Sequence, residues 1–362
     1  MEMMKNIYSR INSWLERKEP VALATIIESE GSTPQVAGAS ALFSEQGLLG
    51  GTLGGGVIEA DAQVKAARCL KEGKSLYYEL ELRGDSLASE EAICGGSVSI
   101  LIDASPLKHL ETFRRLKESL FSRQAGLLIS KVRMKPSGDV SISRRWLGEK
   151  PALEGIGEKE ISSIAKEIEG SRHEGAPKMI RKKERGEGEI LFFLERLSPL
   201  PQLVIAGAGH IGQAVAHLGK LLDFEVTVID DRSEFANPKR FPEADAICVA
   251  DISRAVADFP ITSDTYIVIV TRGHSHDAEA LRGCIQSPAA YIGMIGSRRK
   301  VALMREKFMA ERWATAAEFD RIHAPIGLKI GSKTIAEIAV SIAAELVLVR
   351  SGVEQTKIAG HR

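Results

Sequence analysis

The chain has 362 residues, of which 44% are hydrophobic and 27% charged, and its 48 basic side chains equal its 48 acidic ones. A net charge of zero offers no excess of positive charge for nucleic acid, and the longest apolar runs are too short to span a bilayer. The composition is that of a globular protein, and the length suggests two domains of ordinary size.

An opening helix is predicted by the helical spacing of Ile7, Ile11 and Leu15. The strands expected before residue 198 are residues 21–27, 39–44, 76–82, 97–102 and 190–194. Further helices are expected from a glycine-rich loop to residue 71, over 107–121 and over 158–169, with a hairpin turn at 136–139. The basic stretch 178–185 is interpreted as a solvated turn. We therefore expect an N-terminal α+β (mixed) domain over residues 1–198.

The segment Ser-Pro-Leu-Pro at 198–201 cannot easily continue a helix or a strand, so it marks a linker. Beyond it, short apolar segments alternate with helical ones. The expected strands are residues 203–206, 225–229, 246–249, 266–270 and 291–294. Apolar strands alternating with helices predict a parallel sheet covered on both faces. Residues 199–362 are therefore expected to form an α/β domain with a Rossmann-type parallel sheet.

A dinucleotide-binding fingerprint follows the first of these strands, as Gly-Ala-Gly-His-Ile-Gly at 207–212. Gly207 would allow the tight turn, Gly209 the approach of a pyrophosphate, and Gly212 close packing of helix and strand. The helix beginning near His210 would offer free N–H groups to the phosphate. Asp230, at the end of the next strand, would accept hydrogen bonds from a ribose hydroxyl and favours NAD over NADP. Asp231 could take the same role, because strand ends are uncertain by a residue or two.

Two further polar groups follow strands of this sheet. His274, His276 and Asp277 could move protons or bind a metal; the other interpretation is a helix start capped by Ser275 or Asp277. Because no third strong ligand stands at fixed spacing, we expect no metal site and treat His274 as a cleft residue.

Ser297 begins the second group and is an expected N-cap. The bases at 298–300 either meet a phosphate or form a solvated helix start. A capping box at Thr334 predicts the last helix, whose Glu337, Ser341 and Glu345 would either line a cleft or form a solvated face.

The first domain carries its own glycine cluster at 50–56, just before a helix. Backbone N–H groups at Gly54, Gly55 and Gly56 could cradle an anion, with Glu59 one turn into the helix. The loop is not a Walker A motif, since no Gly-Lys-Ser/Thr follows. Cys94, before two glycines, is either a thiol beside a bulky ligand or a buried structural cysteine.

The cysteines also indicate the compartment. None of Cys69, Cys94, Cys248 and Cys284 forms a C-x-x-C pair. This scatter favours reduced thiols and a cytoplasmic protein over a disulfide framework. The first residues lack the apolar core of a signal peptide.

Taken together, these segments resemble the XdhC/CoxI family, the accessory proteins of xanthine dehydrogenase and related molybdenum hydroxylases. The matching segments of the first domain are Gly-Ser-Thr-Pro at 31–34, Gly-Ala at 38–39, the glycine loop with its helix start at 51–59, and Cys-Gly-Gly at 94–96. Those of the second domain are residues 207–212, 230–232, 240–242, 271–274, 276–277, 293–300, 325–331 and 337–342. Residues 106–198 carry no family signal. Many relatives place Cys or Arg where this chain has Val57, so a ligand touching that position would be held differently.

The resemblance implies a cofactor chaperone rather than a catalyst. Such proteins bind molybdenum cofactor (molybdopterin) as cargo, assist its sulfuration by a cysteine desulfurase, and deliver it to an apo xanthine dehydrogenase-type enzyme. They tend to form homodimers. We expect the two glycine-rich regions to face one cleft, with Glu59, Cys94 and His274 near it.

Two other functions are compatible with the sequence. One is an NAD(P)-dependent oxidoreductase that uses the Rossmann site, and the other is a nucleotide sensor or transferase without redox chemistry. An oxidoreductase needs a proton-transfer residue near the nicotinamide. His274 is the clear candidate, and the sequence contains no Tyr-x-x-x-Lys pair, which favours the chaperone.

Overall fold

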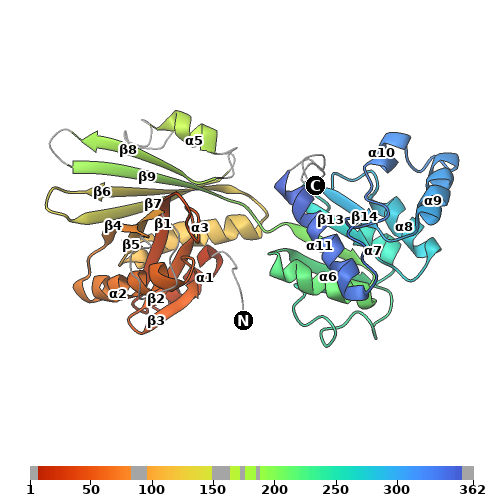
Figure 1. Ribbon diagram of the computed structural model, residues 1–362, viewed down its shortest axis with the longest axis horizontal. Coiled ribbons are helices and arrows are strands. Elements are labelled where there is room, and N and C mark those ends of the chain that lie inside the picture. Colours follow the sequence, from red (N-terminus) through yellow and green to blue (C-terminus); the bar gives the residue numbers. More distant parts are fainter. Residues whose placement is uncertain (1–6, 83–95, 149–163, 172–175, 185–187, 353–362) are drawn as a thin grey trace. The chain divides into compact units, whose positions relative to one another are not determined.

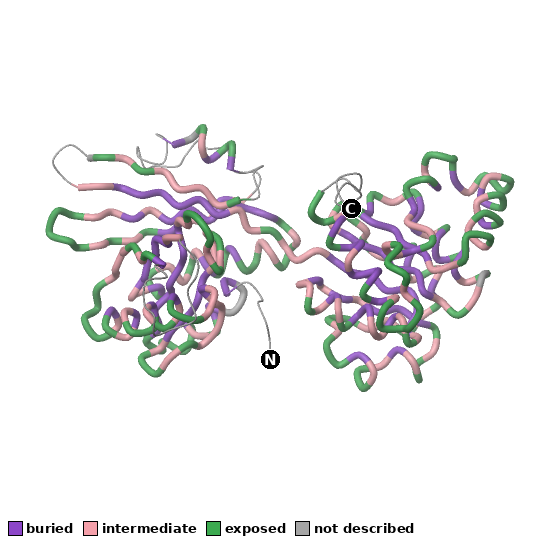
Figure 2. The backbone as a smooth tube through the Cα atoms, viewed as in Figure 1, coloured by how far each residue is buried: buried purple, intermediate pink, exposed green. Residues whose placement is uncertain are grey.

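The computed structural model describes residues 7–82, 96–148, 164–171, 176–184 and 188–352. The chain divides into two compact units between Pro199 and Leu200, within the predicted 198–201 linker. Each unit has its own buried core (Figure 2).

The first unit contains an antiparallel sheet that is covered on both faces. Its strands lie in the order β3 (Gly47–Gly51), β2 (Ser40–Ser44), β1 (Ala22–Glu30), β5 (Ser97–Asp103) and β4 (Leu76–Glu81). Helix α2 (Gly56–Glu72) packs on one face, where Ile58 meets Ile26 and Phe43. Helices α1 (Ile7–Glu16) and α3 (Leu110–Phe121) share a second core with alternate residues of β1 and β2.

A second antiparallel sheet packs against the first in the same unit (Figure 1). Its order is β7 (Val140–Gly148), β6 (Gly126–Met134), β9 (Gly188–Leu197) and β8 (Lys178–Glu184). Its inner face contributes Val132 and Phe193 to a core shared with Ile27 and Leu101 of the first sheet. On the outer face, Ile168 of α5 (Ala165–Ser171) joins a further core. This confirms the mixed architecture expected for the N-terminal domain.

Three expectations for this unit need correction. The basic stretch expected to be a solvated turn is strand β8, which pairs with β9 along its length. Part of the glycine loop is strand β3, paired with β2. The helix expected from residue 107 begins as the 3₁₀ turn η1 (Pro106–His109) before α3. The part of the expected helix at 158–163 lies outside the described residues.

The second unit is a five-stranded parallel sheet, as the sequence predicts. Its order is β12 (Ala246–Val249), β11 (Glu225–Asp230), β10 (Gln202–Ala206), β13 (Thr265–Ile269) and β14 (Tyr291–Met294). All four pairings are parallel. The chain order reverses between β10 and β13, and open α/β sheets bind ligands at the carboxyl ends of the strands beside such a point.

Helices cover both faces of this sheet (Figure 1). Helices α6 (His210–Leu221) and α11 (Ile335–Ser351) share one core with it. Helices α7 (Ile252–Ala257), α8 (His274–Cys284), α9 (Arg298–Ala310) and α10 (Ala316–Asp320) adjoin the other. Among the described residues, no helix combines the length and the apolar character needed to cross a membrane.

The helix starts are partly as predicted. Ser297 caps α9, and Thr334 with Glu337 forms a complete capping box on α11, which confirms both predictions. Helix α8 is capped by Gly273 rather than by Ser275 or Asp277. The solvated face proposed for α11 is wrong at Ser341 and Glu345, which are buried.

Candidate functional site

The glycine turn after β10 has the geometry that a dinucleotide site requires. Gly207 has φ +121°, and a Cβ atom there would overlap the carbonyl oxygen of Val270, so no other residue fits without strain. A Cβ atom at Gly212 would overlap Gly207 itself. At Gly209, in contrast, nothing lies within 4 Å of an added Cβ. The turn therefore packs tightly on its inner side and is open at Gly209, where a pyrophosphate would approach.

Helix α6 begins directly at this opening. Gly209 is its N-cap, and no side chain caps the first turn in the described structure. His210 is the first helical residue and is exposed. The free N–H groups of the turn and the helix dipole would both favour a phosphate there.

Asp230, the predicted ribose acceptor, is buried with both carboxylate oxygens already bonded. Oδ1 accepts hydrogen bonds from N and Nε of Arg232 at 3.0 and 2.8 Å. Oδ2 accepts from Nη2 of Arg232 at 2.9 Å and from the Ala208 N–H at 2.8 Å. Burial alone would raise the pKa of Asp230, but these bonds outweigh it and lower the pKa to about 2. The carboxylate thus holds the glycine turn, and it could accept from a ribose only if Arg232 moved.

The alternative acceptor, Asp231, is more accessible. Its Oδ2 accepts a hydrogen bond from Nη2 of Arg272 at 2.9 Å, and its side chain is 36% exposed. Because Arg272 follows β13, this pair joins the loops at the ends of β11 and β13. Asp231 therefore lies nearer to solvent than Asp230 on the same edge of the sheet.

Asp277 ties the β13 loop to the β14 loop. Its Oδ1 accepts from N and Oγ1 of Thr271 at 3.1 and 2.6 Å, and its Oδ2 pairs with the Lys300 ammonium. Asp277 is fully buried, so this ion pair is shielded from solvent. Asp277 is therefore a structural anchor for these loops. Lys300, whose role the sequence left open, is its partner.

The other predicted residues of this edge are placed less fully. His274 is the first residue of α8, but its side chain lies outside the described atoms. His276 lies 3.8 Å from Glu279 on the same helix. Ser297 accepts the Lys300 N–H as a helix cap.

The sequence missed a buried polar cluster beneath α11. Glu345 accepts hydrogen bonds from Tyr291 Oη at 2.6 Å and from the Gly327 N–H at 2.9 Å, and it lies 3.2 Å from His323 Nδ1. Burial raises the pKa of Glu345, but these partners outweigh it and lower the pKa overall. The four-residue spacing of Ser341 and Glu345 was the available signal, since a polar stripe on a helix can face inward as well as outward.

In the first unit, three predicted segments come together. A Cβ atom on Gly54, which has φ +104°, would lie 2.8 Å from Cβ of Pro34. A Cβ atom on Gly96 would lie 2.6 Å from the carbonyl oxygen of Ser32. The glycine loop and the Gly96 segment therefore both pack against the turn at 31–34. Cys94 lies outside the described residues.

Glu59 occupies the centre of the glycine loop. Its Oε2 accepts from Thr52 Oγ1 at 2.9 Å and from the N–H groups of Leu53 and Gly55 at 3.0 and 3.3 Å. The predicted anion cradle thus already holds a carboxylate of the chain itself. Nothing lies within 4 Å of an added Cβ at Gly55 or Gly56, and Val57 is 49% exposed. The open surface of the loop is therefore at the start of α2.

A pocket of about 240 Å³ opens beside this loop and is lined by Gly51, Thr52 and residues 35–40. Tyr8 also lines it and donates its hydroxyl to the buried Glu195 carboxylate, at 3.0 and 3.1 Å from the two oxygens. Burial raises the pKa of Glu195 to about 7 against the partial compensation of Arg144 and Tyr8. The pocket wall is therefore backed by a carboxyl group that titrates near neutral pH.

Comparison with known proteins gives the same family for both units. The model of the XdhC Rossmann domain matches residues 203–346, and the model of the XdhC and CoxI family matches residues 14–80. The chain is 26% identical over 351 residues to the uncharacterized protein YqeB of Escherichia coli (strain K12), covering 96% of the chain and 46% of that relative. It thus spans about half the length of YqeB.

Two further relatives match along nearly their whole length. A protein of Bacillus subtilis (strain 168) named as a probable subunit of xanthine dehydrogenase is 25% identical over 352 residues, covering 97% of this chain and 99% of that protein. A crystal structure described as a xanthine dehydrogenase from Bacillus halodurans has a TM-score of 0.74 at 24% identity, covering 96% of this chain and 97% of that one. This similarity supports the fold. Since the two matched models describe the two units of one architecture, the chain belongs to the XdhC and CoxI family.

Proposed function

We propose that this protein is an accessory factor that binds molybdenum cofactor and assists its sulfuration and insertion into a xanthine dehydrogenase-type enzyme. Membership of the XdhC and CoxI family supports the role, as does similarity along nearly the whole length to a relative named as a probable component of xanthine dehydrogenase. The partners would be the apo-enzyme and a cysteine desulfurase, and the protein would act as a homodimer.

The observation that carries the proposal for the first unit is the convergence of its three glycine-containing segments. Gly54 and Gly96 both lie against the turn at 31–34, and the glycine loop borders a pocket. Molybdopterin carries a phosphate and a pterin ring, so it needs backbone N–H donors beside a space for a flat ring. Glu59 would hold the loop in shape, and the open start of α2 would receive the phosphate.

The second unit would bind a dinucleotide, NAD or NADP, at the glycine turn of α6. Gly207, Gly209 and Gly212 have the conformation and spacing to admit a pyrophosphate. The charged residues of this edge pair mainly with one another, as in Asp230–Arg232 and Asp277–Lys300. Groups engaged in this way position loops rather than transfer protons, which favours a binding role over the oxidoreductase alternative.

The cargo is tested by purifying the full chain from its native host and measuring molybdopterin through the fluorescence of its oxidised form. We expect bound cofactor in the wild type and at least a tenfold loss in Cys94→Ser if the thiol contacts the cargo. Cys69→Ser is the control, because Cys69 is buried in α2. Absence of molybdopterin from the native protein, with the client enzyme present, would contradict the proposal.

The dinucleotide site is tested with Gly209→Val. Because Gly209 has φ −71° and open space around it, valine should fold normally while blocking the approach of a pyrophosphate. We expect calorimetry to show NAD or NADP binding to the wild type and not to the variant, with an unchanged melting temperature. Steady turnover of NAD(P)H with a small substrate would favour the oxidoreductase.

The homodimer is tested separately by analytical ultracentrifugation of the full chain. A monomer in sedimentation would contradict it.

A further inference from the structure

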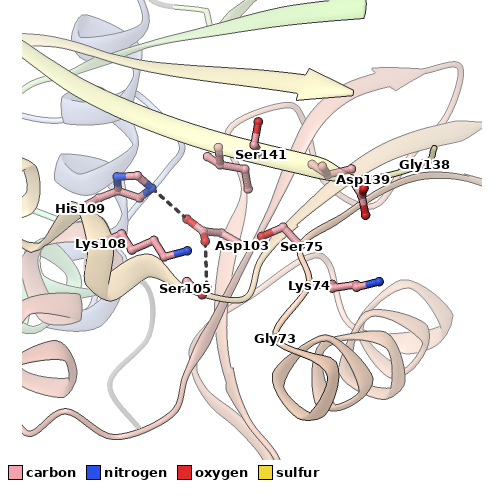
Figure 3. Close-up of a pocket in the computed structure, with 12 residues that line it drawn as sticks. Gly73, Lys74, Ser75, Asp103, Ser105, Lys108, His109, Gly138, Asp139 and Ser141 are labelled. Atoms are coloured by element: carbon pink, nitrogen blue, oxygen red, sulfur yellow. Dashed lines mark hydrogen bonds and ion pairs between the residues drawn. The ribbon is translucent and has the colours of Figure 1, made fainter. Parts of the chain in front are cut away.

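A pocket of about 210 Å³ lies elsewhere in the first unit, where three turns meet (Figure 3). The turn after α2 contributes Lys74 and Ser75, the segment after β5 contributes Lys108 and His109, and the β6–β7 hairpin contributes Asp139. None of these residues belongs to the glycine-containing segments that carry the proposed cofactor site. The pocket therefore needs its own explanation.

The floor of this pocket is a carboxylate whose charge is already matched. Asp103 is buried, and its Oδ1 accepts the Ser105 N–H at 3.0 Å. Its Oδ2 accepts a hydrogen bond from Nε of the buried Arg144 at 3.3 Å and lies 3.8 Å from Nε2 of His109. Since Arg144 balances Asp103, the two lysines that line the pocket, Lys74 and Lys108, face one remaining carboxylate there, Asp139.

Two nitrogen groups that could receive an anion come from η1. The ammonium of Lys108, which is a cation, and the imidazole of His109, which becomes one on protonation, both point toward Asp103 (Figure 3). Burial lowers the pKa of His109, and the charges of Arg144 and Lys108 lower it further against the opposite effect of Asp103. The imidazole would therefore take up a proton when an anion binds beside it.

The buried guanidinium behind the pocket also has capacity left. Arg144 donates through Nη1 to Ser130 Oγ at 3.1 Å, while its Nη2 has no hydrogen-bond partner among the described residues. The nearby Glu195 has its pKa raised to about 7, mainly by burial, so it is largely protonated in mildly acidic solution. Under those conditions Asp103 balances Arg144 without the help of Glu195, so the surroundings of the pocket become more positive.

The geometry points to a binding site for a phosphate group, either inorganic phosphate or the head of a small phosphomonoester. Lys108 would supply the ion pair, and protonated His109 a second positive donor. Ser75, whose Oγ accepts the Ala104 N–H at 3.2 Å, keeps its own hydroxyl hydrogen to donate. A dianion suits these donors better than a single-charged carboxylate, because it can pair with both cations. Asp139 at the hairpin would disfavour larger anions at that side.

The proposal is tested on the full chain by calorimetry with inorganic phosphate, glycerol phosphate and acetate. We expect phosphate to bind and Lys108→Gln to weaken it at least tenfold; because Lys108 is exposed, the variant should fold. Lys117→Gln is the matched control, since Lys117 is exposed on α3 and does not line the pocket. Binding of phosphate alone would identify a free-phosphate site, and binding of both phosphates a monoester site; either result supports the inference.

A second measurement follows the proton. Sulfate keeps its charge between pH 8 and pH 6, so its affinity for this site should rise over that range as His109 and Glu195 take up protons. The rise should be smaller in His109→Gln, which keeps the contribution of Glu195 alone. Phosphate should also raise the His109 pKa in histidine NMR spectra. No phosphate binding, equal weakening in Lys108→Gln and Lys117→Gln, or acetate binding as tight as phosphate would each overturn the inference.

Discussion

Replacing Glu195 by glutamine should change the stability of the first unit in a way that depends on pH. Relative to the wild type, the variant should become more stable as the pH rises from acid to alkaline values. Glu195 is fully buried, and its pKa rises from 4.5 to about 7 on folding. Below pH 4.5 the carboxyl is protonated in both the folded and the unfolded state, so its favourable contribution is complete. As the pH rises from 4.5 to 7, the unfolded chain gains from ionisation and the folded chain does not. This difference between the folded and unfolded pKa values lowers the free energy of unfolding of the wild type by about 3 kcal/mol, at ~1.4 kcal/mol per pKa unit.

The assay follows tryptophan fluorescence during urea unfolding in a Trp313→Phe background. The three tryptophans are Trp14 and Trp146 in the first unit and Trp313 in the second, so this background reports on the first unit. The free energy of unfolding of Glu195→Gln minus that of its parent should increase by about 3 kcal/mol between pH 4.5 and pH 8. Glu118→Gln, an exposed change on α3, should show no such trend. Parallel pH profiles for parent and Glu195→Gln would refute the reasoning.

Three further predictions concern the second unit. Gly207→Ala should lower the free energy of unfolding by about 2–4 kcal/mol through steric overlap, while Gly209→Ala should change it by less than ~1 kcal/mol; equal melting temperatures would contradict this. Lys300→Met should cost about 3–5 kcal/mol by leaving the Asp277 carboxylate buried without its cation, and adding Asp277→Asn should recover part of the loss in urea titrations. Asp230→Asn should remove stability that is present above about pH 4 and lost as the pH falls toward 2; an unchanged acid-unfolding curve would count against the Asp230 network.

The second unit could be predicted closely because its signals are local. Each strand is a short apolar run, and β10, β13 and β14 are buried at every residue, although the edge strand β12 is not. The glycine turn fixes where the first helix begins. The first unit was harder to predict. Strand β8 is rich in lysine and arginine, and it forms a strand because β9 offers a full ladder of backbone partners, which no property of residues 178–184 reveals. Strand β3 likewise depends on its pairing with β2.

The candidate sites show the same division. The tight turn at Gly207 and the close packing at Gly212 could be predicted because the spacing of the glycines determines them, while a part in binding stays a prediction. The partners of charged residues could not be predicted, because they come from distant parts of the chain: Lys300 reaches Asp277, and His323 reaches Glu345. For Asp230 the partner, Arg232, was two residues away, yet spacing alone does not tell whether a carboxylate faces a ligand or a neighbouring guanidinium. The predicted roles of Cys94 and His274, and of a cleft shared by the two glycine regions, stay predictions.

Strand β8 lies at the edge of the second sheet, since on one side it pairs with β9 and on the other no described strand lies next to it. Open edges of this kind invite aggregation through strand addition unless something repels the incoming strand. Here the edge carries Lys178, Arg181, Lys182 and Lys183 within seven residues. Two copies meeting edge to edge would bring the lysines of this strand together, and their repulsion should disfavour strand addition. The basic residues that made the strand hard to predict from the sequence would thus also act against aggregation of the folded protein.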